Sequence, residues 1–179
     1  MIRLPAFAIL LLSSTLATAQ KMPPSAFESW GVCPFECCTY REWTADGDIP
    51  VHRDRDEKSA LVFRLHEGEA VDGLNGVVVA EQAGAVIIER PLRDGYVDGS
   101  DEPQLALDPG DVVYMVAPLG EGAYRFWYQG KVYVSGSDLR AMPISGPPAR
   151  FTWWKQVKNN AGKTGWTASD QFSHVDACG

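Results

Sequence analysis

Apolar side chains recur at every second position in several short segments of the chain. Leu61, Phe63 and Leu65 give the period of two that predicts a half-buried β-strand. Further short runs of apolar, β-branched and aromatic residues predict strands near residues 51, 70–71, 77–80, 85–92, 111–119, 123–130 and 131–136, and on both sides of a tight turn at 159–162. No stretch after residue 19 keeps an apolar period of 3.6 over three turns. The pattern therefore predicts an all-β protein of many short strands.

Turn-forming residues separate these runs. Residues 67–69 and 129–130 predict tight turns, and the charged segment 53–59 (RDRDEKS) predicts an exposed turn of mixed charge. Two longer segments, 94–110 and 142–150, are rich in glycine, proline or aspartate. We expect both of them to be mostly loop.

The first nineteen residues have the composition of a secretory signal peptide. Arg3 precedes an apolar run at 4–12, and small residues at 17 and 19 fit a cleavage site. The apolar run is too short to span a bilayer, and no later segment is long enough either. We expect cleavage after Ala19, which predicts a periplasmic or secreted protein without membrane insertion.

Charge narrows the range of partners. The full chain of 179 residues has a formal net charge of −7, and removal of residues 1–19 takes away only Arg3 and leaves −8. No basic patch or stripe is present in the sequence. Nucleic acid and anionic membrane surfaces are therefore excluded as expected partners.

Two segments resemble the bacterial SH3-like family, whose domains occur in exported proteins. The segment VHRDRDEKSALVFRLHEGEAV resembles the first half of that domain, and WWKQVKNNAGKTGW resembles its last hairpin, with the Gly165-Trp166 pair as the most distinctive element. The resemblance covers residues 49–79 and 151–172. About seventy residues (80–150) separate the two halves, where a family member needs only a short loop.

The resemblance implies a small, strongly bent β-barrel in one of two forms. Either a single SH3-like barrel carries a long inserted β segment, or two SH3-like units share a final hairpin and the second begins near Gly110. The expected segments are a signal peptide (1–19), an N-terminal cysteine-containing segment (20–43), an SH3-like β domain (44–172) with an insertion at about 80–150, and a C-terminal tail (173–179) tied back by Cys178.

The resemblance also implies a non-catalytic module that binds a peptide, a protein or cell-wall material. A barrel this small fills its interior with side chains, so a ligand is expected on loops and in an aromatic groove. The candidate contact residues are Trp127, Tyr128, Trp153, Trp154 and Trp166. Adjacent residues of a strand face opposite sides, so one of Trp153 and Trp154 is expected to be exposed or to lie under a loop, unless both are packed.

Four cysteines raise the question of metal, catalysis or disulfides. Cys33, Cys37 and Cys38 lie close together, and Cys178 lies one residue from the C-terminus. The spacing lacks the paired knuckles of a zinc site, so no metal is expected. Disulfides are the expected state in an exported protein. A Cys37–Cys38 bond would be strained, which leaves Cys33 bonded to Cys37 or Cys38 and the remaining one bonded to Cys178.

The sequence therefore predicts an exported binding or interaction module with no catalytic residues and no cofactor. A phosphate-binding loop and a nucleophile elbow are both absent from the sequence. The alternatives are a small hydrolase or thiol enzyme of the cell envelope, and a structural component of an envelope assembly.

Overall fold

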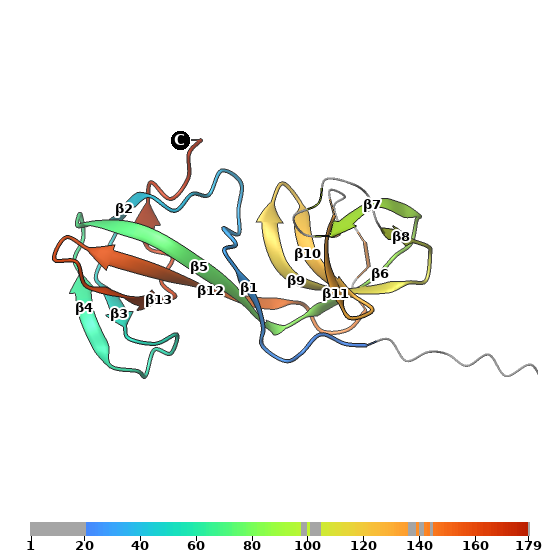
Figure 1. Cartoon of the computed structure of the whole chain (residues 1–179), viewed down its shortest axis with the longest axis horizontal. Coiled ribbons are helices and arrows are strands. Elements are labelled where there is room, and N and C mark those ends of the chain that lie inside the picture. Colours follow the sequence, from blue (N-terminus) through green and yellow to red (C-terminus); the bar gives the residue numbers. More distant parts are fainter. Residues whose placement is uncertain are drawn as a thin grey trace, which may run out of the picture.

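The computed structural model describes residues 21–97, 100, 105–135, 139, 142–143 and 145–178. Every regular element within these residues is a β-strand, and the strands form two curled, antiparallel half-barrel sheets that make the two lobes of an elongated molecule (Figure 1). The predicted all-β class is confirmed. The prediction for residues 1–19 lies outside the described residues.

The first sheet is built from both ends of the described chain. Its strand order is β14-β2-β5-β12-β13-β3-β4, and β1 also pairs with β5. The bounds are β1 (Phe27–Trp30), β2 (Glu42–Ala45), β3 (Ile49–His52), β4 (Leu61–Leu65), β5 (Ala70–Gln82), β12 (Arg150–Asn159), β13 (Thr164–Thr167) and β14 (Phe172–Ser173).

Two long strands, β5 and β12, run along the length of this sheet (Figure 1). The 13 residues of β5 span about 40 Å, because each residue advances a strand by about 3.3 Å. β2 pairs with the start of β5 and β1 pairs with its end, at residues 70–72 and 77–80 respectively. The length of β5 therefore gives two short strands room on one edge.

The second sheet is formed by the chain between β5 and β12. Its order is β6-β9-β10-β11-β7-β8. The bounds are β6 (Gly84–Ile87), β7 (Leu92–Val97), β8 (Leu105–Leu107), β9 (Val112–Gly120), β10 (Ala123–Tyr128) and β11 (Lys131–Ser135). The expectation that residues 94–110 are mostly loop is wrong for β7 and β8, which occupy part of that segment. β7 pairs with β11 on one side and with β8 on the other.

Each sheet encloses its own apolar core, and two smaller clusters join them. The first core includes Trp43, Val51 and Leu65, and the second is centred on Phe126 and Leu107, all of them buried. Between the sheets, side chains of β5 pack against side chains of β9 in two small clusters. The two half-barrels are therefore continuous through packed apolar side chains.

All four cysteines lie within the described residues and form two disulfides. Cys33 is bonded to Cys38 and Cys37 to Cys178, with Cα–Cα distances of 5.4 and 5.7 Å. The predicted disulfides are confirmed, and this pairing is one of the two that the sequence left open. Because disulfides persist in oxidising compartments, the two bonds indicate an extracytoplasmic protein. No helix among the described residues is long and apolar enough to cross a membrane.

Candidate ligand-binding groove

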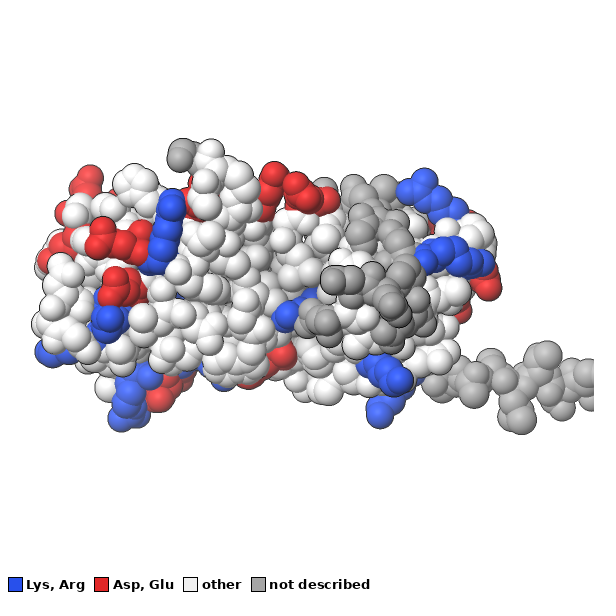
Figure 2. Space-filling view, turned by 45° about the horizontal axis from the view of Figure 1, so that its top comes forward, with Lys and Arg blue, Asp and Glu red and all other residues white. Residues whose placement is uncertain are grey.

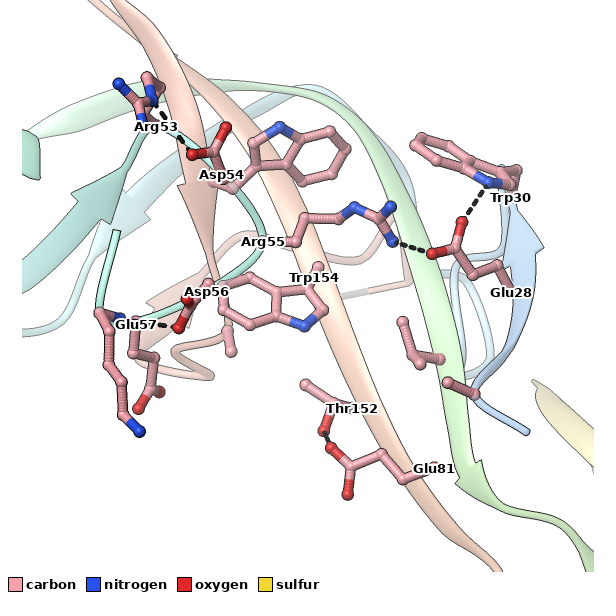
Figure 3. Close-up of a pocket in the computed structure, with 15 residues that line it drawn as sticks. Glu28, Trp30, Arg53, Asp54, Arg55, Asp56, Glu57, Glu81, Thr152 and Trp154 are labelled. Atoms are coloured by element: carbon pink, nitrogen blue, oxygen red, sulfur yellow. Dashed lines mark hydrogen bonds and ion pairs between the residues drawn. The ribbon is translucent and has the colours of Figure 1, made fainter. Parts of the chain in front are cut away.

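An open groove of about 930 Å³ lies on the outer face of the first sheet. The three tryptophans Trp30, Trp154 and Trp166 line it, together with residues 53–58 of the loop between β3 and β4 (Figure 3). We call it the tryptophan groove. Strand alternation places these rings on one face, because Trp30 and Trp154 are both register partners of Val77 on β5.

The Gly165-Trp166 pair positions the third ring. A Cβ atom at Gly165 would lie 2.7 Å from the backbone oxygen of His52, so only glycine lets β13 approach β3 this closely. Trp166 is the register partner of His52 on one side and of Gln156 on the other. Its ring therefore extends over the same face as Trp154.

The loop that walls the groove is ordered by its own hydrogen bonds. The amide of Arg53 donates to the Ala60 carbonyl at 2.9 Å, and the amide of Asp54 donates to the Ser59 hydroxyl at 3.1 Å. The Asp56 carboxylate accepts from the Lys58 amide at 2.9 Å. These bonds fix the shape of the wall without any bound group.

Arg55 differs from the exposed residue expected in this turn, because its side chain reaches across the groove to β1 (Figure 3). Its guanidinium carbon lies 4.9 Å from the ring centroid of Trp30 and 5.7 Å from that of Trp166. Its Nη1 donates to Glu28 Oε1 at 2.8 Å, and Trp30 Nε1 donates to Glu28 Oε2 at 3.0 Å. We call Glu28, Trp30, Arg55 and Trp166 the Arg55 site.

The charge of Arg55 changes the acidity of its partner. The hydrogen bond from Arg55 and its positive charge lower the pKa of Glu28, and this outweighs the opposing effect of burial. Glu28 is therefore ionised when Arg55 is bound to it. The Arg55 site is an ion pair that lies against two aromatic faces.

The rest of the groove surrounds Trp154. Thr152, two residues earlier on the same strand, donates a hydrogen bond from its hydroxyl to Glu81 at 2.7 Å. The residues that line the groove include five carboxylates and three cations, which are Glu28, Asp54, Asp56, Glu57 and Glu81, and Arg53, Arg55 and Lys58. The groove thus combines apolar ring faces with a net negative charge.

Of the five candidate contact residues, the tryptophan groove brings together Trp154 and Trp166. Trp153 faces the opposite side of β12, where its Nε1 donates to the Tyr40 hydroxyl at 3.1 Å and its ring contacts Trp43. The expectation that these neighbouring tryptophans face opposite sides is thereby confirmed. Only Trp154, of the two, lines the tryptophan groove.

Trp127 and Tyr128 lie on β10 of the second sheet and do not line the groove. Trp127 is 9% exposed, and its Nε1 donates to the Lys21 carbonyl at 2.8 Å. The Tyr128 hydroxyl donates to the Asp111 carboxylate at 3.1 Å. Burial, with Asp111 adding to it, raises the pKa of Tyr128.

Three members of the Arg55 site were not among the candidates, namely Glu28, Trp30 and Arg55. The sequence FESW does alternate, because Glu28 and Trp30 share a face while Ser29 is buried. Four residues form too short a pattern to identify a strand within a cysteine-containing segment. Trp30 is also 49% exposed, so its ring contributes to an apolar patch at the surface.

A second cavity of about 660 Å³ lies beside the buried lysine of β12. The Lys155 ammonium donates to the carbonyls of Trp153 and Ala168 at 3.2 and 3.3 Å and to Asp170 at 2.7 Å. Burial lowers the pKa of Lys155, although Asp170 opposes this. All three N–H donors have acceptors, so this lysine connects β12 to the segment before β14.

The described residues contain no group of three or more His, Cys, Asp and Glu side chains that could hold a metal ion. The four cysteines are all in disulfides, so none is available as a thiolate nucleophile in this state. Charged side chains of both signs are interspersed on the face shown in Figure 2.

Comparison with known proteins finds no match for this chain among protein-family models, curated proteins or solved structures. The resemblance to the bacterial SH3-like family therefore stays a prediction.

Proposed function

We propose that this protein is an exported, non-catalytic binding module that holds an extended peptide in the tryptophan groove. The observation that carries the proposal is the convergence of Trp30, Trp154 and Trp166 from three strands beside an ordered loop of mixed charge. Aromatic-lined grooves are a recurrent way to hold extended peptides, because flat rings provide apolar area at low entropic cost.

The size and shape of the groove suit such a ligand. Its volume of about 930 Å³ lies in the range typical of small-ligand pockets, roughly 300–1,000 Å³. The groove is open to solvent, so an extended chain can enter it from the surface. An extended peptide advances about 3.3 Å per residue, so a few residues would fill it.

Charge favours a peptide over anionic wall polymers. The groove has five carboxylates against three cations, and the whole chain has a formal net charge of −7. Like charges disfavour association and lower the rate of encounter. A role as a structural component would instead favour a broad, flat apolar patch.

The test is selection of binders from a library of random twelve-residue peptides displayed on phage, with the mature chain (20–179) as bait. We expect selected peptides to bind with micromolar Kd and Trp154→Ala to weaken them about 30-fold, since central tryptophans contribute about 2 kcal/mol or more to interfaces. Leu61→Ala is the control, because Leu61 is 53% exposed on β4 and lies outside the groove.

Two results would overturn the proposal. One is a failure to select any peptide while purified cell-wall sacculi co-sediment with the protein. The other is a set of bound peptides whose affinity is the same for Trp154→Ala and wild type. Circular dichroism of the variant establishes that it is folded before either result is interpreted.

A further inference from the structure

We infer that the Arg55 site is a cation-binding subsite which the chain fills with its own Arg55, and that a guanidinium or ammonium group of the bound peptide displaces Arg55. This inference deepens the proposed function and names the chemical class of ligand that the groove selects. It makes Arg55 an internal competitor of the ligand.

The subsite has the three parts that recognise a cation. Two indole rings lie with their centroids 5.9 Å apart and their planes at 80°, and the Arg55 guanidinium lies over both of them. The carboxylate of Glu28 closes that space, and the Trp30 indole N–H holds the carboxylate in place. Indole faces and a carboxylate together attract a cation more strongly than either does alone.

The subsite is built on strands, whereas its occupant comes from a loop. Glu28 and Trp30 belong to β1 and Trp166 belongs to β13, and all three have register partners in the first sheet. Arg55 is in the β3–β4 loop, and its side chain remains 26% exposed. The side chain of Arg55 can therefore leave without breaking a strand pairing, and the subsite would keep its shape.

The neighbouring charges support an exchange. Asp54, Asp56 and Glu57 are in the same loop as Arg55 and line the same groove, so they can accept the displaced guanidinium. Displacement of Arg55 breaks its ion pair with Glu28, and only a cationic ligand restores that pair. An uncharged or anionic group therefore gains nothing by displacing Arg55.

The attachment of Arg55 to the β3–β4 loop also determines which ligands can displace it. A side chain held on a short loop competes at an effective concentration in the millimolar range. A single free cation would compete poorly against it. A peptide that places a cation in the subsite and a neighbouring side chain on Trp154 gains a second contact, so the groove selects the combination.

The test uses acetyl-arginine amide as the probe and its uncharged citrulline analogue as the matched negative. Binding to the mature chain is followed by the indole N–H signals of Trp30 and Trp166 in nuclear magnetic resonance. If Arg55 leaves the subsite open in about one molecule in ten, Arg55→Met should bind the probe about tenfold more tightly than wild type does. Arg64→Met is the control, because Arg64 is an exposed residue of β4 outside the groove and its loss removes the same charge.

A second readout keeps the inference testable if Arg55→Met does not fold. In wild type, the side-chain Nε–H signal of Arg55 should move toward the position of solvated arginine when the arginine probe is added in excess. The inference is overturned if this signal stays in place while Trp30 and Trp166 respond. It is equally overturned if a folded Arg55→Met binds the probe no more tightly than wild type, or if the citrulline analogue binds as well.

The two proposals fail in different ways. Peptides that require Trp154 but contain no excess of arginine or lysine, and whose binding Arg55→Met does not change, would refute the cation subsite alone. Failure of the peptide selection, together with tighter probe binding by Arg55→Met, would refute the peptide module and leave the subsite intact.

Discussion

The disulfide between Cys37 and Cys178 ties the C-terminal segment to the N-terminal one. We expect its loss to destabilise the fold more than loss of the disulfide between Cys33 and Cys38 does. The perturbation is the double substitution Cys37→Ser and Cys178→Ser, which leaves no unpaired thiol. The bonded cysteines are 141 residues apart. In the chain-entropy model, closing a loop of that length lowers the entropy of the unfolded chain and stabilises the fold by about 5 kcal/mol.

The other disulfide provides a matched control. Cys33 and Cys38 are only 5 residues apart, and the same relation gives about 2 kcal/mol for a loop of that length. The pair of substitutions Cys33→Ser and Cys38→Ser removes the same atoms from the same region. The difference in loop length therefore predicts a gap of about 3 kcal/mol between the two variants.

Hydrogen bonds that remain in the Cys37/Cys178 variant limit the free energy of unfolding that it loses. The Thr39 amide still donates to the Val175 carbonyl at 2.9 Å, and the Ala177 amide to the Cys37 carbonyl at 2.8 Å. Each such bond contributes about 1 kcal/mol net. They are present in both variants, so they do not change the predicted order.

The assay is urea unfolding at pH 7, followed by tryptophan fluorescence, under non-reducing conditions. We expect the Cys37/Cys178 variant to lose about 3–5 kcal/mol in the free energy of unfolding. The reasoning is refuted if the two double variants lose equal amounts, or if the variant without the long-range bond is the more stable of the two.

Three further predictions concern single residues. Burial lowers the pKa of Lys155 below 10.5, so the unfolded chain holds the Lys155 proton more tightly than the folded chain does. Wild type should therefore gain stability relative to Lys155→Met as pH rises from the lowered pKa to about 10.5. Urea midpoints of the two proteins that stay parallel from about pH 7 to 11 would contradict this. Gly165→Ala would place a methyl group 2.7 Å from a backbone oxygen of β3 and should cost about 1–3 kcal/mol by overpacking, whereas an unchanged melting temperature would disprove the close approach of β13. Tyr40→Phe removes a hydroxyl that donates to the Val32 carbonyl at 2.6 Å and accepts from Trp153 at 3.1 Å, so it should cost about 1–3 kcal/mol; a loss below about 0.5 kcal/mol in urea unfolding would show that water replaces the hydroxyl.

The strands were predictable where apolar side chains alternate with a period of two, because one face of the strand is buried. Leu65 is 1% exposed at the inner end of β4, whereas Leu61 at the other end is 53% exposed, so the alternation identified the strand but not its depth. The disulfides were predictable because the strain of a bond between adjacent cysteines leaves few pairings. The local alternation and the strain between adjacent cysteines both depend on residues close together in the sequence.

Strands that depend on distant partners were not predictable in the same way. Gly95 lies in β7, where the side chain of Leu105 fills the space above it and would lie 3.1 Å from a Cβ atom added at this glycine. Glycine and aspartate disfavour strands locally, but pairing with β11 and β8 overrides that preference.

Only part of the groove was predictable from the sequence. Trp154 stood out because its strand is long and aromatic, and Trp166 stood out through the Gly165-Trp166 pair of the resemblance. Arg55 lies in a turn whose mixed charge predicts exposure. Only the pairing of β1 with β5 places Glu28 and Trp30 next to it. A contact between residues 27 positions apart has no local signature.

The central claim is that ligands bind in the tryptophan groove. The most direct measurement is a titration of residues 20–179 with a selected peptide, followed by the indole N–H signals of all six tryptophans. The account predicts that Trp30, Trp154 and Trp166 shift together in proportion to bound peptide, while Trp43 and Trp127 stay in place. Shifts centred on Trp127, with Trp30, Trp154 and Trp166 unmoved, would place the binding site on the second sheet and contradict the account.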